Sequence, residues 1–196
     1  MPCPVPVEIL RLKHKDKRPR EYLYEHEIDA LIKVANGPNK TRDQALILIS
    51  YRHGLRAGEA SNLKWSQIDF ETRRIHVTRQ KGGIDSVHPI RDQEIRLLKK
   101  LWENRVSGSP YVFMTNRGTK FNTAAFQKMI ASLGKKANLT IPQIHPHMLR
   151  HSTGYKLANE GIDTRTIQDY LGHSNINNTV IYTKLSSAKF DGLFLE

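Results

Sequence analysis

Apolar residues recur with helical spacing along most of the chain, starting near Glu21. Positions 28, 31, 32 and 35 follow the i, i+3, i+4, i+7 rule, and an Asn-Gly-Pro turn ends this first pattern. Thr41 and Gln44 have the spacing of a capping box, which predicts a second helix through the apolar run 45–49 that stops at Gly54. We therefore expect two packed helices in the first third of the chain.

The period changes from 3.6 to 2 in the middle of the chain. Residues 74–78 alternate between polar and apolar side chains, the turn composition Gln80-Lys81-Gly82-Gly83 follows, and a second extended stretch covers 86–90. Two such stretches joined by a Gly-rich turn are typical of a β-hairpin. Between the second helix and this hairpin we expect a short helix around 55–59, with packing residues that extend to Ile68.

Helical periodicity returns in the second half, where glycines and one aspartate mark the helix ends. The expected helices are 95–102, 126–133, 148–160, one between the cap Asp163 and Gly172, and 178–185. The pattern as a whole predicts a mainly α fold with one small β-hairpin or sheet.

The two ends of the chain differ from this folded middle. Residues 1–20 combine several prolines with a series of lysines and arginines, which predicts a flexible basic arm that either contacts DNA or is only a solvated tail. Residues 21–185 make up the expected folded domain. In 186–196, Phe190, Leu193 and Phe194 have helical spacing, so this segment is expected to pack on a neighbouring protomer or on its own chain.

Composition narrows the class of protein. The 196 residues include 31 Lys and Arg against 19 Asp and Glu, and the resulting net charge of +12 favours a polyanionic partner, nucleic acid first. The longest apolar run, 45–49, is far below the roughly 20 residues that cross a bilayer, so no membrane partner is expected. A single cysteine, Cys3, and the lack of a secretory apolar segment favour the cytoplasm.

Candidate chemistry is concentrated in the last third of the chain. An imidazole at position 147 and a guanidinium at position 150 project from one face of a helix, so both can address the same bound phosphate. The concentrated residues are His145, His147, Arg150, His151, His173 and Tyr182.

Three other interpretations of this cluster stay open. His147 and His151 have metal-ligand spacing, with His145 as a third ligand, although no cluster of carboxylates lies beside them. The helix–Gly–helix pattern over 149–171 also fits a helix-turn-helix DNA reader. Tyr182, finally, fits an ordinary core tyrosine.

The ordered set of motifs resembles the tyrosine recombinase (phage integrase) family over about residues 21–184. Arg56-x-x-Glu59, Lys81 in a Gly-rich turn, His147-x-x-Arg150 and Leu171-Gly172-His173 occur in family order, and Tyr182 follows His173 by the usual nine residues. Any one of these motifs is weak, and together they are specific. The stretches "IHPHMLRHS" and "GIDTRTIQDYLGH" further resemble the short recombinases that invert fimbrial promoter switches.

The resemblance implies the family's catalytic-domain fold, without the N-terminal core-binding domain of larger members, and a site that needs neither metal nor cofactor. Arg56 and Arg150 would hold the two non-bridging phosphate oxygens through forked hydrogen bonds. Tyr182 would attack phosphorus and form a 3′-phosphotyrosyl bond. The remaining implied roles are general base or proton relay for His147, general acid for Lys81, a phosphate hydrogen bond for His173, and support from Glu59 and His151.

The implied partners are double-stranded DNA with paired recombination sites, three further protomers in a synaptic tetramer, and accessory DNA-bending proteins at the nucleoid. The leading hypothesis is DNA inversion that controls fimbrial phase variation. A prophage-type integrase or excisionase shares the same residues. A DNA-binding regulator that keeps the fold without catalysis is the alternative from another class, although the complete set of motifs argues against it.

Overall fold

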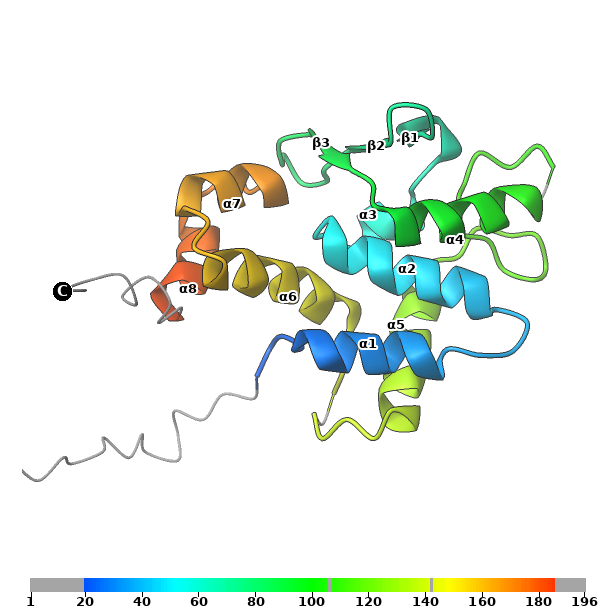
Figure 1. The fold of residues 1–196 in the computed structure, drawn as a ribbon, viewed down its shortest axis with the longest axis horizontal. Coiled ribbons are helices and arrows are strands. Elements are labelled where there is room, and N and C mark those ends of the chain that lie inside the picture. Colours follow the sequence, from blue (N-terminus) through cyan, green and yellow to red (C-terminus); the bar gives the residue numbers. More distant parts are fainter. Residues whose placement is uncertain (1–19, 106, 142, 186–196) are drawn as a thin grey trace, which may run out of the picture.

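The computed structural model describes residues 20–105, 107–141 and 143–185. Helices dominate, which confirms the predicted fold class (Figure 1). The predicted tail 186–196 and nearly all of the predicted arm lie outside the described residues. The helices are α1 (Glu25–Val34), α2 (Lys40–Arg52), α3 (Ala57–Ser61), the short 3₁₀ helix η2 (Trp65–Gln67), α4 (Asp92–Glu103), α5 (Thr123–Lys136), α6 (Pro146–Asn159), α7 (Thr164–Leu171) and α8 (Asn177–Leu185).

The predicted hairpin is confirmed and forms part of a three-stranded antiparallel sheet in the order β1-β2-β3. Strands β2 (Arg74–Val77) and β3 (Ser86–Pro89) pair in antiparallel fashion, with Val77 opposite Ser86. Strand β1 (Ile68–Asp69) was not predicted, because Ile68 was expected to pack beside a short helix. Two residues are too few to show a period of two.

One predicted helix boundary is wrong. Helix α2 begins at Lys40, so Thr41 lies inside the helix, and the side chain of Gln44 donates to the carbonyl oxygen of Ile32 instead of closing a capping box. Arg20, the last residue of the predicted arm, forms an ion pair of 2.6 Å with Glu27. The partner of Gln44 lies outside its own helix, and the local sequence does not reveal such a partner.

The caps predicted around α7 are confirmed. The Asp163 carboxylate accepts hydrogen bonds from the backbone N–H groups of Arg165 and Thr166, which satisfies two of the free donors at the helix start. Gly172 ends the helix with a φ of +64°, a left-handed conformation that favours glycine. The chain therefore reverses sharply just before His173.

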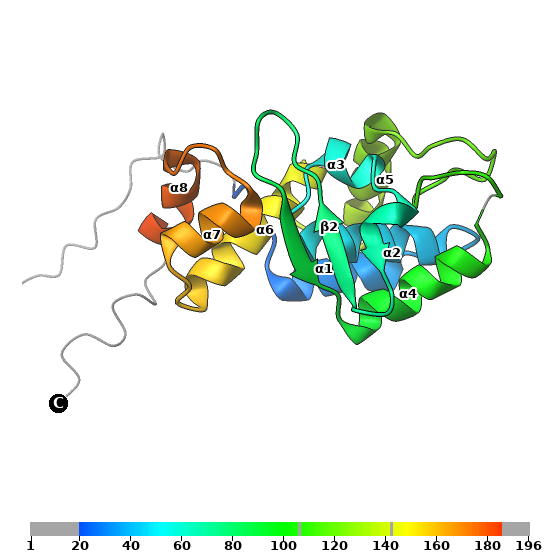
Figure 2. The same cartoon turned by 90° about the horizontal axis from the view of Figure 1, so that it is seen from above.

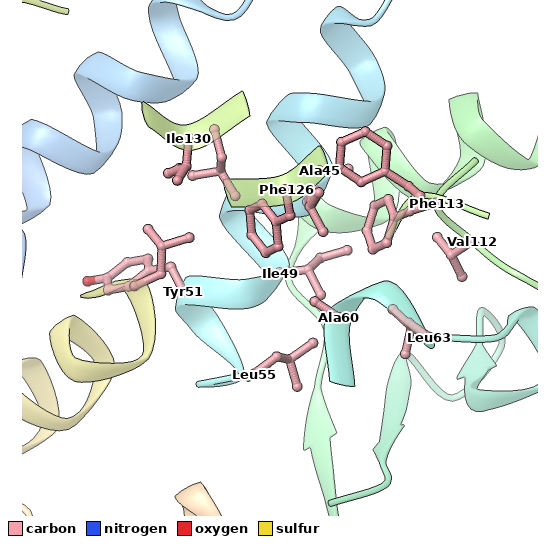
Figure 3. Packing of buried hydrophobic residues seen from close by; sticks show 14 of the residues in the cluster. Ala45, Ile49, Tyr51, Leu55, Ala60, Leu63, Val112, Phe113, Phe126 and Ile130 are labelled. Carbon is pink, nitrogen blue, oxygen red and sulfur yellow. The ribbon is translucent and has the colours of Figure 1, made fainter. Parts of the chain in front are cut away.

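Most of the hydrophobic core surrounds α2, whose residues 45–49 are all buried. This main cluster includes side chains from α1, α4, α5 and the sheet, and Figure 3 shows Ile49, Phe126 and Ile130 within it. A second, smaller cluster lies between α6, α7 and α8 and contains Ala158, Ile167, Leu171 and Tyr182. Helix α6 runs from the main body to this C-terminal group of helices (Figures 1 and 2).

Candidate active site

The Glu59 carboxylate is the hub of the site. Its two oxygens accept hydrogen bonds from the backbone N–H and the guanidinium of Arg56, at 2.9 and 2.6 Å, because α3 places the two residues one turn apart. The same carboxylate accepts from the N–H of Gln80 and from Arg79, and it lies 3.8 Å from the Arg150 guanidinium. Although burial raises the pKa of Glu59, these donors outweigh it and lower the pKa, so the group is ionised.

Arg150 is almost completely buried, with 1% of its surface exposed. Its Nη1 donates to the carbonyl oxygen of Gly54 at 2.5 Å and its Nη2 to that of Leu171 at 2.8 Å. Burial, together with the charges of Arg56 and Arg79, lowers its pKa to about 9, so the guanidinium stays charged at neutral pH. Three arginines, Arg56, Arg79 and Arg150, therefore surround the single carboxylate of Glu59, which leaves an excess of positive charge.

Tyr182 is also 1% exposed, and its hydroxyl forms a 2.9 Å hydrogen bond with Nδ1 of His151. Its ring lies over Gly154, where an added Cβ would come within 2.6–2.7 Å of three ring atoms. Burial raises the pKa of Tyr182 to about 12, against the opposing charges of Arg150 and Arg56. The interpretation of Tyr182 as a core tyrosine is therefore correct for its ring, which is packed. It does not account for the hydroxyl, which faces a titratable partner.

The three histidines of the predicted site have different environments. His147 is exposed, and its ring lies edge-on against His151 with 4.4 Å between centroids. Burial, His147 and Arg150 lower the pKa of His151 to about 4, so this ring is neutral at physiological pH. The structure thus gives the contact with Tyr182 to His151, which the sequence ranked as a supporting residue, and not to His147.

His173 follows the left-handed turn at Gly172. Its Nδ1 is hydrogen-bonded to Oγ1 of Thr179 at 2.8 Å, and its ring stacks with that of Tyr182 at 6.4 Å. Burial and nearby arginines lower its pKa to about 3. This arrangement fixes the ring and leaves its Nε2 without a partner among the described residues, which suits a neutral donor to a bound anion.

Lys81 is the predicted residue that the structure does not bring into contact with the others. It is exposed, with a φ of +58°, in the loop between β2 and β3. Gly83, in the same Gly-rich turn, is packed against the end of α7, where an added Cβ would lie 2.7 Å from the carbonyl oxygen of Gly172. The loop is therefore anchored on one side and open at Lys81.

The rival interpretations find little support in this geometry. Within the described parts of the chain, no group of three or more His, Cys, Asp or Glu side chains is arranged to hold a metal ion. His145 faces Glu21 at 3.2 Å and does not converge with His147 and His151. Residues 149–171 do form two helices around a left-handed Gly161, but Arg150 on the first of them is buried in the site. None of the described helices is long and apolar enough to cross a membrane.

The sequence motifs do not include one polar residue of this region, Arg79. Arg79 lies at the end of β2, and its side chain is completely buried beside Glu59. An arginine that follows an alternating strand and precedes a Gly-rich turn predicts an exposed cation, so no sequence signal distinguishes it.

Comparison with known proteins places this site in a family. The phage integrase family matches residues 21–189. The chain is 41% identical to the type 1 fimbriae regulatory protein FimB of Escherichia coli K12 over 189 residues, which cover 93% of this chain and 94% of FimB. It is 39% identical to FimE of the same strain over 181 residues, covering 89% and 91% of the two chains. The crystal structure of XerA recombinase superposes with a TM-score of 0.76 at 32% identity, covering 89% of this chain and 64% of that one.

The fold and the comparisons define a tyrosine-type site-specific recombinase, with the fold of a tyrosine recombinase catalytic domain. The chain belongs to the phage integrase family, and the fimbriae regulatory proteins are relatives that it matches over nearly their whole length.

Proposed function

We propose that this protein inverts a DNA segment that controls fimbrial expression, by cutting and rejoining strands through a 3′-phosphotyrosyl intermediate on Tyr182. The hydrogen bond between Tyr182 and His151, next to two arginines that share one carboxylate, is the observation that carries the chemistry. Identity to FimB and FimE over most of the chain supports the biological role.

In the proposed reaction, Arg56 and Arg150 hold the scissile phosphate. Each guanidinium uses part of its donors on protein oxygens, which fixes its plane, and has N–H groups left for the non-bridging phosphate oxygens. These hydrogen bonds strengthen as negative charge builds on the phosphate in the transition state. His173 adds a further donor through Nε2.

The Tyr182 oxygen forms a bond to phosphorus while the bond from phosphorus to the 5′-oxygen breaks. The phenol proton passes to Nδ1 of His151, at 2.9 Å, and His147 is the next ring in the direction of solvent. This assigns the relay to the histidine pair, with His151 as its first member. Lys81 gives a proton to the departing 5′-oxygen once the loop meets the DNA. Energy is retained in the phosphotyrosyl ester, so neither a nucleotide nor a metal ion is required.

The proposed partner is double-stranded DNA that carries paired sites, bound by a tetramer of this chain with the help of DNA-bending proteins. A net charge of +12 supports strong, salt-dependent attraction to the phosphate backbone. We place the protein in the cytoplasm, at the nucleoid.

The test uses a nicked suicide duplex. The duplex carries the DNA sequence to which the protein binds when DNA fragments are selected for binding. The duplex is incubated with protein in EDTA and analysed on a denaturing gel. The protein should form a covalent adduct, Tyr182→Phe should form none, and Tyr155→Phe is the matched control, because that ring lies 5.1 Å from Tyr182 and has no assigned chemistry. An adduct formed by Tyr182→Phe, or one that EDTA abolishes, would contradict the proposal.

A further inference from the structure

Arg79 has the densest hydrogen bonding of the arginines around the site. Its guanidinium donates to Glu59 at 3.0 Å and to three backbone carbonyl oxygens: those of Gly54 and His53 at 3.1 Å, and that of Tyr170 at 2.5 Å. These acceptors belong to the α2–α3 junction, to α3 and to α7. One side chain therefore connects the sheet to both halves of the catalytic site.

The aliphatic part of Arg79 passes between two glycines. A Cβ added at Gly83 would lie 2.8 Å from the Arg79 Cβ, and one added at Gly172 would lie 2.6 Å from its Cγ. Both cartoon views show the loop between β2 and β3 beside the end of α7 (Figures 1 and 2). Larger residues at either position would push the loop away from Gly172, which immediately precedes His173.

Both sides of the turn that carries Lys81 are held by this arrangement. The backbone N–H of Arg79 donates to the Asp85 carboxylate at 2.7 Å, which closes the base of the loop. The N–H of Gln80 donates to Glu59 at 3.1 Å, on the carboxylate that Arg79 also contacts. Lys81 is the next residue, so Arg79 and Glu59 fix the point from which its side chain extends.

Packing alone does not explain a buried arginine here. Burial and the charge of Arg56 lower the pKa of Arg79, and Glu59 opposes this change. Keeping the buried guanidinium charged therefore costs free energy. Its Nε has no hydrogen-bond partner among the described residues. An apolar side chain of similar volume would fill the space without that cost, but it would not bind the three carbonyl groups.

We propose that Arg79 is a positioning residue for protonation of the leaving group. Its side chain is fully buried and all of its hydrogen bonds in the described residues go to protein oxygens. It acts by fixing the Lys81 loop against the end of α7. The inference rests on the proposed role of Lys81 as general acid and extends it to a residue outside the family motifs named above.

The experiment compares two suicide substrates that differ only in the bridging 5′ atom, oxygen or sulfur. A thiolate is a much better leaving group than an alkoxide, because a thiol has a pKa near 8.5, so a sulfur substrate does not need the acid. The variants are Arg79→Lys, which keeps charge but loses the planar fork, and Lys81→Ala as the reference for loss of the acid. Ile130→Ala, in the main core, controls for lost stability.

We expect Arg79→Lys and Lys81→Ala to cleave the oxygen substrate roughly 100-fold more slowly than the unmodified protein, and the sulfur substrate within a few-fold of it. Ile130→Ala should leave the ratio of the two rates unchanged. Equal slowing of Arg79→Lys on both substrates, with Lys81→Ala rescued by sulfur, overturns this inference alone. Equal slowing of Lys81→Ala on both substrates overturns the acid role and this inference with it.

A second variant keeps the inference testable if Arg79→Lys does not fold. Gly83→Ala retains Arg79 but displaces the loop from the end of α7, and Gly83 does not have a positive φ that would add backbone strain. The same rescue by sulfur is expected. If Gly83→Ala folds and cleaves both substrates at the unmodified rate, the contact between the loop and α7 does not position the acid.

Discussion

The two hydrophobic clusters of this molecule differ in what they contain. The main cluster consists of aliphatic and aromatic side chains from helices α1–α6, the short helix η2, the sheet and the segments that join them, and its members have no assigned chemistry. The small cluster between α6, α7 and α8 has Tyr182, the proposed nucleophile, as its largest buried side chain. One cluster maintains the fold, whereas the other also positions the proposed nucleophile.

Polar bonds join the two regions. Arg150 donates to the carbonyl oxygen of Gly54 on the main body and to that of Leu171 on α7. The hydroxyl of Tyr170 donates to the carbonyl oxygen of Arg52 at 2.7 Å, and Thr153 bonds to that of Tyr51. Directional bonds of this kind set relative orientation more sharply than apolar contact does. Stability and alignment of the nucleophile should therefore respond to different substitutions.

The largest effect is expected in the main cluster. Ile130→Ala removes a fully buried side chain from α5 and should lower the free energy of unfolding by about 2–5 kcal/mol. Urea unfolding followed by circular dichroism measures the loss. Adduct formation per folded molecule, at a temperature well below unfolding, should stay within a few-fold of the unmodified protein. A much larger loss of cleavage would show that the two regions are not separable in this way.

The opposite result is expected in the small cluster. In Gly154→Ala, the added methyl would come within 2.6–2.7 Å of the Tyr182 ring and shift it. A displacement of the order of 1 Å costs roughly 100-fold in cleavage, equivalent to about 3 kcal/mol in the barrier. The suicide-substrate assay measures the rate, and unfolding of the same sample shows that stability falls by less than in Ile130→Ala. Unchanged cleavage would mean that the resting place of the ring is not its reacting place.

The effect of pH on stability should be smaller for any single histidine. Burial lowers the pKa of His88 and His173 to about 3 and that of His151 to about 4, below the value near 6.5 in an unfolded chain. The unfolded state therefore binds protons first as the pH falls. The stability is fully present above pH 6.5 and is lost as the pH falls towards 4, at roughly 1 kcal/mol per pH unit for each histidine.

Unfolding in urea at pH 7.5, 6.5 and 5 measures this slope. His151→Gln should flatten it by the share of one histidine, because glutamine does not titrate in this range. Stability that rises as the pH falls would contradict the assignment of these rings as neutral in the folded state.

The sequence predicted the helices of the main body well because each has a long apolar stripe, and Asp163 and Gly172 marked the limits of α7. It missed β1, where two residues show no period, and it placed a capping box at Thr41 that tertiary contacts override. These errors occur where the local signal is short or where a distant residue supplies the partner.

The site was predicted in composition and only partly in geometry. The motifs named Arg56, Arg150 and Tyr182, but the spacing of His147 and His151 on one helix does not determine which ring meets α8. Arg79 was beyond the reach of the sequence, because its partners come from three separate segments that only the fold assembles. The roles of all these residues stay predictions until the variants are assayed.

Helix α6 sets the distance between the buried Arg150 guanidinium and Gly154, whose backbone lies under the Tyr182 ring. Arg150 and Gly154 are four residues apart, slightly more than one helical turn, so both face the same side of the helix. A one-residue insertion between them would rotate Gly154 by about 100° around the helix axis and move the packing surface of the Tyr182 ring away from Arg150. The spacing within this single turn therefore fixes where the ring lies relative to the guanidinium.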